Sequence, residues 1–310
     1  MDSSSVDGYE HVLDATRVLK AVVDDLFDLP GAAQTRAVAR REELGEDHGD
    51  DLLCGCWAAA TTATATLELA GRHMDAVIHL AADHAGFAPS AAVLARAALE
   101  SLLRVRWLLD PEDANDREQR WAAVKKEETR FYRNAGFLSD ADFNEEIDEI
   151  DAVAQHAGGT IVKAIPSVET LARDYGKAPT LYDHFYRFGS QPTHGTLVGA
   201  GTFEMDARCG WQALGHEGEW IEAEFWGGPL TACWEGATIA LPRYRDLLVP
   251  KHELPGLGRE ADFVAAMRAL PANYQAKATA ALGVAADRLQ SAPQLNRAQR
   301  RAAQRARRSK

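Results

Sequence analysis

The sequence predicts an all-α protein, a multi-helix bundle with a short helical, basic C-terminal appendage. Apolar residues recur at spacings of three and four over long stretches, which indicates amphipathic helices. Ser, Gly and Pro residues punctuate these stretches where helices start and stop. No period-two alternation is long enough to predict a sheet. We therefore expect three parts: an N-terminal helix and mobile connection over 1–50, a helical bundle core over 51–250, and an appendage over 251–310.

The N-terminal half starts with two predicted helices. Over residues 9–27 the apolar side chains form one stripe, whereas residues 31–50 are polar and lack a sustained apolar period, so we predict a mobile connection there. Residues 51–84 contain no Pro and predict a long, closely packed helix rich in Ala and Thr, with Gly71 as a point of bending.

The next predicted helix starts at Pro89 and Ser90 and carries three charges on an otherwise apolar run. Arg96, Glu100 and Arg104 lie four residues apart, and therefore project from one face. Because a buried charge needs a partner, we predict that Glu100 bridges to an Arg and extends the network to His79 or Arg187.

The later elements follow from caps and breaks. A charged helix is expected over 116–137, and Ser139 and Ser167 are expected to cap the next two helices, ending near Gly158 and Tyr175. Another helix is predicted to run from Pro179 to Gly189. Residues 220–248 are apolar and aromatic with two internal prolines, which predicts one kinked core helix.

Charge is distributed unevenly along the chain. The net charge is −12, but residues 1–296 carry 27 basic and 46 acidic residues, a net charge of −19. The basic tail from Arg297 to Lys310 contains seven basic residues and no acidic one. It can become helical on an anionic surface such as RNA, fold back onto the acidic body of this chain, bind a protein partner, or remain a disordered solubilising tail. Its predicted nucleic-acid-binding residues are Arg297, Arg300, Arg301, Arg305, Arg307 and Arg308.

Targeting and cysteine signals are weak. No uncharged apolar stretch of about 18 residues and no signal-peptide pattern occurs, so a cytoplasmic protein with no membrane partner is expected. The four cysteines lack C-x-x-C spacing, so reduced, buried thiols are expected.

No specific cofactor or metal motif is present, so no cofactor and no metal are predicted. The alternative is a metal-dependent hydrolase that uses the histidines of residues 73–84. Asp75, His79 and Asp83 lie four residues apart and could meet at one cation. The favoured interpretation is that Asp75 or Asp83 pairs with His79, or that these residues pair with Arg96 or Arg104. The cluster consists of His73, Asp75, His79, Asp83 and His84.

The most informative segment is residues 186–195. Arg187 is a fixed cation and His194 a titratable imidazole, separated by a helix stop and by Ser190. Such a pair can bind a phosphate and transfer a proton. The plainer interpretation is structural: Arg187 pairs with Glu100 or another buried carboxylate.

Two resemblances follow from these residues. The Arg96-x3-Glu100 helix, together with Tyr186-Arg187 and Ser190 before His194, resembles DUF5677, a family of bacterial helical proteins of unknown function. The segment from Arg187 to His194 also resembles the Arg-x4-6-His motif of HEPN ribonucleases, which occur in toxin-antitoxin and phage-defence systems. Phe188 and Pro192 depart from the HEPN pattern.

The HEPN resemblance implies metal-independent RNA cleavage by a homodimer. His194 would act as base or acid, Arg187 would hold the phosphate, and Ser190 would donate a hydroxyl. A non-catalytic helical binding or regulatory module is the alternative, and the acidic body favours it because an RNA groove normally needs more cations.

Overall fold

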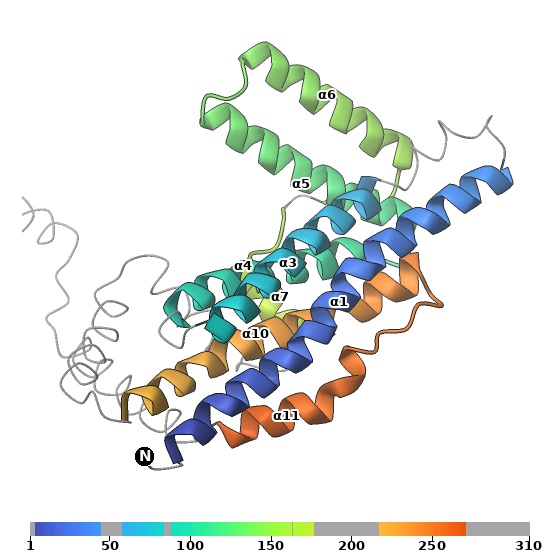
Figure 1. Cartoon of the computed structure of the whole chain (residues 1–310). Coiled ribbons are helices and arrows are strands. Elements are labelled where there is room, and N and C mark those ends of the chain that lie inside the picture. The colour runs from blue at the N-terminus through green and yellow to red at the C-terminus, as the bar shows by residue number, and fades with distance from the viewer. Residues whose placement is uncertain (1–3, 45–57, 84–87, 163, 177–216, 271–310) are drawn as a thin grey trace, which may run out of the picture. The chain divides into compact units, whose positions relative to one another are not determined.

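The computed structural model describes residues 4–44, 58–83, 88–162, 164–176 and 217–270. In these ranges the chain forms α-helices and one 3₁₀ turn and no strand, which confirms the predicted all-α class (Figure 1). No helix within them is long and apolar enough to cross a membrane.

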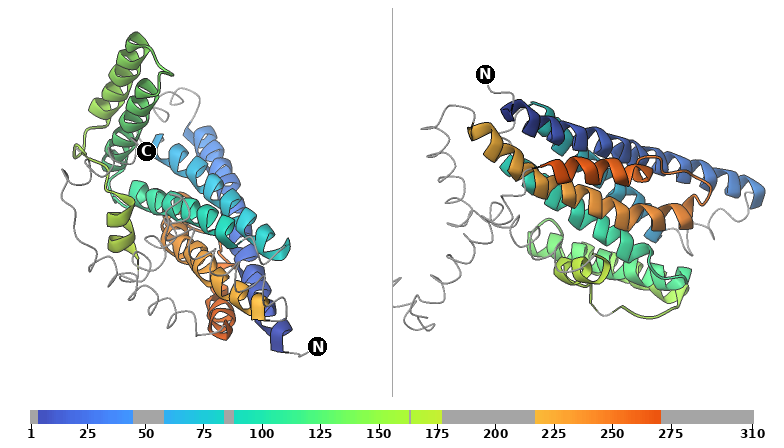
Figure 2. Two further views of the ribbon diagram at one scale, coloured as in Figure 1. Left: turned by 90° about the vertical axis from the view of Figure 1, so that its left-hand side faces the viewer. Right: turned by 90° about the horizontal axis from the view of Figure 1, so that it is seen from below.

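Four long helices make the core: α1 (Ser4–Leu44), α3 (Ala58–Asp83), α4 (Ala88–Leu109) and α10 (Glu217–Leu248). Each packs on two others, since α1 contacts α3 and α10 while α4 contacts the same two helices from the other side. Both views in Figure 2 show this arrangement. Most of the stripe predicted on α1 is buried, for example at Leu19, Val22 and Leu26.

The contact between α4 and α10 is especially close at Gly236. A Cβ at this position would lie 2.9 Å from Leu102 Cδ1 and 3.3 Å from Leu99 Cδ1. The absence of a side chain therefore lets the two helices approach each other in the centre of the core.

Prolines do not end two of these helices. As predicted, α10 is one helix, and it contains Pro229 and Pro242. In α1, however, the helix continues through Pro30 to Leu44, so the connection predicted from residue 31 was wrong up to that point. Residues 32–44 are mostly Ala, Arg, Gln and Glu, which favour helix without an apolar stripe.

The compact unit extends to Leu270, beyond the boundary predicted at residue 250. The 3₁₀ turn η4 (Leu257–Arg259) and α11 (Glu260–Ala269) pack on α1. The buried Asp25 carboxylate accepts a hydrogen bond from the Gly256 N–H at 2.9 Å, and Trp234 stacks on Phe263 with ring centroids 4.5 Å apart. Residues 251–270 are therefore part of the core unit.

The remaining helices are α5 (Ala114–Asn134), α6 (Asp140–Ala157) and α7 (Val168–Tyr175). Ser139 caps α6 in a capping box with Asp142, and Ser167 caps α7, both as predicted. Asp113 caps α5.

Candidate functional site on the α5–α6 hairpin

Helices α5 and α6 form an antiparallel hairpin that projects from the four-helix core (Figure 1). The first turns of α5 contact α3 and α4, whereas α6 packs mainly on α5. The two helices share a small apolar cluster, Ala122, Ile150 and Ala154 with Trp121 beside it, separate from the main core. The hairpin is therefore anchored at its base.

The base is held to the bundle by buried polar contacts. Glu118 is 1% exposed, and its carboxylate accepts a hydrogen bond from the Ala59 N–H at the start of α3. Burial raises the pKa of Glu118, and this bond opposes the rise. Because the first N–H groups of a helix lack intrahelical partners, α5 supplies a cap to α3.

Arg243 of α10 fixes the loop between α4 and α5. Its guanidinium donates to the carbonyls of Leu109, Asp110 and Pro111 at 2.7 to 2.9 Å. A further bond joins Arg243 to Glu112 at 2.9 Å. A cation at the C-terminus of α4 also interacts favourably with the negative end of the helix dipole.

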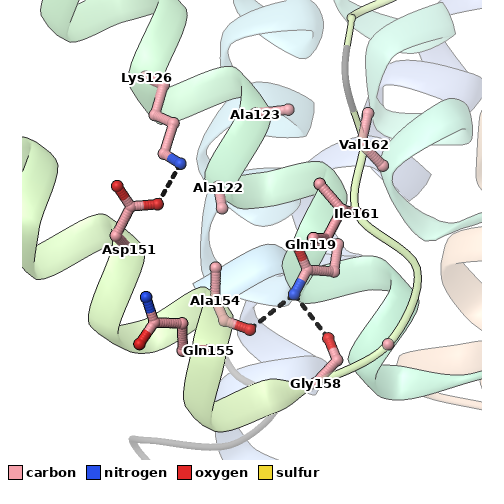
Figure 3. A pocket seen from close by; sticks show the side chains of 11 residues that line it. Gln119, Ala122, Ala123, Lys126, Asp151, Ala154, Gln155, Gly158, Ile161 and Val162 are labelled. Carbon is pink, nitrogen blue, oxygen red and sulfur yellow. Dashed lines mark hydrogen bonds and ion pairs between the residues drawn. The ribbon is translucent and has the colours of Figure 1, made fainter.

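A hollow of about 360 Å³ lies between α5 and the end of α6 (Figure 3). Gln119 Nε2 donates to the carbonyls of Ala154 and Gly158, each at 2.6 Å, and Lys126 pairs with Asp151 across the hollow. These polar groups bond to each other and to backbone carbonyls, and so they hold α5 and α6 together at the base of the hairpin. The hollow therefore offers few free polar groups to a ligand.

Three large aromatic side chains gather at the other end of the hairpin. Phe131 is 65% exposed, Tyr132 45% and Phe137 75%. The rings of Phe131 and Tyr132 lie 5.9 Å apart and those of Tyr132 and Phe137 6.4 Å apart, both edge to face. We call these three residues the aromatic tip.

The hairpin itself does not bury these rings. No residue from Arg130 to Glu149 is buried, and the helices are joined there by polar contacts such as Thr129 Oγ1 to Glu146 at 3.0 Å. A contiguous exposed apolar patch of this kind is typical of an interaction surface.

The charge around the aromatic tip is strongly acidic. Residues 127–149 contain eight acidic residues and two basic ones, a net charge of −6. One of the two basic residues, Arg133, pairs with Asp140 at 2.9 Å and lies over the ring of Phe143. Helix α6 itself carries seven acidic residues and no Lys or Arg.

The predicted charge network is only partly formed. Arg96 Nε bonds to Glu100 at 2.7 Å, as predicted, and both side chains are largely buried. Arg104 makes no ion pair within the described ranges. The Glu100 bridge does not extend to His79, whose side chain is 73% exposed on the solvent side of α3. His79 instead lies 3.5 Å from Asp75, which is the Asp–His79 pairing predicted as the favoured alternative to a metal.

The alternative metal cluster does not assemble among the residues that the structure describes, where no three His, Cys, Asp or Glu side chains converge. Asp75 instead pairs with Lys20 at 3.2 Å. Cys233 is a buried thiol, as predicted, and burial raises its pKa to about 12. His84 and the side chain of Asp83 lie outside the described part.

The predicted catalytic residues Arg187, Ser190 and His194 lie outside the described residues, as do the six tail arginines. Before that segment begins, Tyr175 at the end of α7 donates to Asp110 at 3.2 Å, and Arg106 pairs with the same carboxylate at 2.7 Å. Burial and the charge of Asp110 raise the pKa of Tyr175. These contacts fix α7 to the end of α4.

Sequence reasoning placed Phe131 and Tyr132 on a charged helix and did not identify the aromatic tip. The available signal was adjacent aromatics followed by Phe137, after the turn at Gly136, in a segment dominated by charged residues. Such a segment has too few apolar positions to bury three rings within itself.

Comparison with known families gives one match. The model of DUF5677, a family of unknown function, matches residues 63–206. This range includes α4, α5, α6, α7 and most of α3. No significant match was found among curated proteins or among solved structures.

Proposed function

Residues 63–206 of this chain belong to the DUF5677 family, and we propose that the hairpin within this segment makes the protein a helical binding module. The observation that carries the proposal is the aromatic tip, three exposed rings of which Tyr132 contacts both Phe131 and Phe137, on an element that projects from the core (Figure 1). Aromatic residues dominate the binding energy of protein interfaces.

The way the hairpin is built supports this role. Its base is fixed by the Glu118 cap and by the bonds of Gln119, whereas residues 130–149 at its distal end include no buried residue. A rigidly anchored element presents its contact groups with little loss of conformational entropy on binding. The other exposed large apolar residues on the bundle, such as Leu69 and Val93, belong to no such cluster of ring contacts.

Site-specific photo-crosslinking tests the proposal. A benzophenone-bearing amino acid placed at Phe137 is expected to give a discrete protein adduct in cells that produce the full chain. The matched control is the same group at Leu69, an exposed apolar position on α3. No adduct from Phe137, or an equal yield of the same adduct from Leu69, would contradict a binding role for the hairpin.

A second candidate function rests on the motif of Arg187, Ser190 and His194. We propose it as metal-independent RNA cleavage. A base removes the proton of the 2′-hydroxyl, the 2′-oxygen bonds to phosphorus, and the bond to the 5′-oxygen breaks as an acid protonates that oxygen. His194 supplies proton transfer, Arg187 stabilises the phosphate charge, and Ser190 donates a hydrogen bond.

Cleavage of single-stranded RNA in the presence of EDTA tests this candidate. The expected products carry cyclic-phosphate or 3′-phosphate ends. Activity should be lost in Arg187→Ala and in His194→Ala while the melting temperature stays unchanged. Lower melting temperatures in both variants, without cleavage by the wild type, would identify a structural pair.

A further inference from the structure

We propose that the aromatic tip docks a basic amphipathic helix of another protein. The inference rests on the proposed binding role and specifies the partner. Phe131, Tyr132 and Phe137 supply the apolar contact, and the carboxylates around them supply the charge that selects a cationic partner.

Two glutamates of α5, Glu127 and Glu128, lie next to the aromatic rings, and we call them the acidic rim. Glu127 precedes Phe131 by four residues and Glu128 precedes Tyr132 by four, so each carboxylate lies one turn below a ring. Both glutamates are exposed, and Glu128 pairs with Lys125 at 2.9 Å in solvent. The rings can contact Leu residues on the apolar face of an amphipathic helix, and the glutamates can pair with Lys residues that flank this face.

The same charge argues against a polyanion. Nucleic acids and anionic membranes need a cationic surface, because their affinity comes from contacts between Lys or Arg and phosphate. Around the aromatic tip, eight acidic residues outnumber two basic ones. Stacking of bases on the rings would have to overcome this repulsion.

A second copy of this chain is also disfavoured as the occupant. A two-fold interface brings the same patch of each subunit together. Two tips with a net charge of −6 each would then face one another. Like charges placed opposite each other across an interface oppose association.

Fluorescence anisotropy with the full chain tests the proposal. The probe is a synthetic helix of about 18 residues with Leu on one face and Lys on the other. The matched probes are the same peptide with Glu in place of Lys, and a single-stranded oligonucleotide. Only the Lys peptide should bind, and added salt should weaken its binding.

Two sets of variants locate the site. The triple variant Phe131→Ser, Tyr132→Ser and Phe137→Ser should raise the Kd for the Lys peptide by at least about tenfold. The double variant Glu127→Gln with Glu128→Gln should raise the Kd for the Lys peptide about threefold and should make this Kd less dependent on salt concentration. Circular dichroism and melting temperature should be unchanged, because none of these side chains is buried.

Control variants separate the tip from net charge. Leu69→Ser with Val93→Ser changes two exposed apolar residues on the bundle, and Glu10→Gln with Glu260→Gln removes two exposed acidic residues of α1 and α11. Each pair should leave the Kd within about twofold. Equal losses in tip and control variants would overturn the proposal, since binding would then reflect the overall acidity.

Other occupants give different results. A preference for the oligonucleotide that the tip variant abolishes would assign the site to nucleic acid. Self-association of the wild type, lost in the tip variant, would assign it to a second copy. Tighter peptide binding after Gln replaces the six tail arginines in the full chain would assign it to that basic segment. Each result overturns the partner inferred here, while an adduct from Phe137 would still support the binding role.

Discussion

Removal of the Arg243 guanidinium should destabilise the fold by about 3 kcal/mol. The side chain is 13% exposed and joins α10 to the loop that leads from α4 into the hairpin. Arg243→Ala would remove the donor to the three carbonyls of Leu109, Asp110 and Pro111. Hydrogen bonds to a charged group contribute about 1.5 to 3 kcal/mol each, and the sum is reduced here because the loop is partly exposed and water can replace some donors.

The ion pair with Glu112 contributes little to that figure. The Glu112 side chain is 89% exposed, so its attraction to Arg243 is screened by solvent. Glu112→Gln is therefore the matched control and should change the free energy of unfolding by less than about 0.5 kcal/mol. Arg243→Lys keeps the charge but lacks the planar fork, and should give an intermediate loss.

Urea-induced unfolding, followed by tryptophan fluorescence at neutral pH, measures these changes. The midpoint should fall for Arg243→Ala and stay constant for Glu112→Gln, with equal slopes. A loss below about 1 kcal/mol for Arg243→Ala would show that water satisfies the end of α4 equally well. Equal losses in the two variants would show that the charge pair, and not the carbonyl contacts, holds the loop.

Three further predictions concern two buried carboxylates, Asp25 and Glu118, and the partly exposed Glu100. Burial raises the pKa of the Asp25 carboxyl group above its ordinary value of 3.8. The stability that the protonated form contributes is therefore fully present at pH values below this ordinary pKa, and it is lost as the pH rises through the raised pKa. The free energy of unfolding of the wild type, minus that of Asp25→Asn, should therefore fall with rising pH over this range, and a flat difference would contradict the burial. Glu118→Ala should cost about 1 to 3 kcal/mol and speed hydrogen exchange at Ala59, whose N–H loses its acceptor. Glu100→Ala should cost about 1 kcal/mol in a denaturation experiment, less than a fully buried pair, because Glu100 is 32% exposed; a loss above 3 kcal/mol would indicate a dry site.

Local signals allowed most of the helices to be predicted from the sequence. An N-cap Ser hydroxyl accepts a hydrogen bond from a backbone N–H in the first turn of the helix that follows it. Ser139 and Ser167 therefore marked helix starts without knowledge of the fold. The apolar stripe of α1 was likewise readable from spacing. These features depend on neighbours within a few residues.

Features set by distant contacts were not predictable in the same way. Residues 32–44 favour helix by composition, but Pro30 precedes them and usually ends a helix; the packing of Ala32 and Ala33 against the main core accompanies the continuation of α1 through it. The orientation of His79 depends on which side of α3 faces α1 and α4. A pattern of three and four residues defines a face but does not identify the neighbour that covers it.

The aromatic tip shows the same limit at the candidate site. Aromatic residues in a charged helix can be packed or exposed, and the sequence of α5 alone does not distinguish the two. Exposure follows from the fact that α6 meets α5 through Ala122, Ile150 and Ala154 near the base, leaving the distal half without an apolar seam. Only the pairing of the two helices reveals this difference.

The family segment and the core unit are not the same. Residues 63–206 include the hairpin, all of α4 and most of α3. The helices that cover the other faces of α3 and α4 are α1 and α10, which lie outside that range. Leu99 and Leu102, for example, are buried against Gly236 of α10. The projecting hairpin is therefore held in position by flanking helices that the family match does not contain, since the Arg243 contacts that fix its base also come from α10.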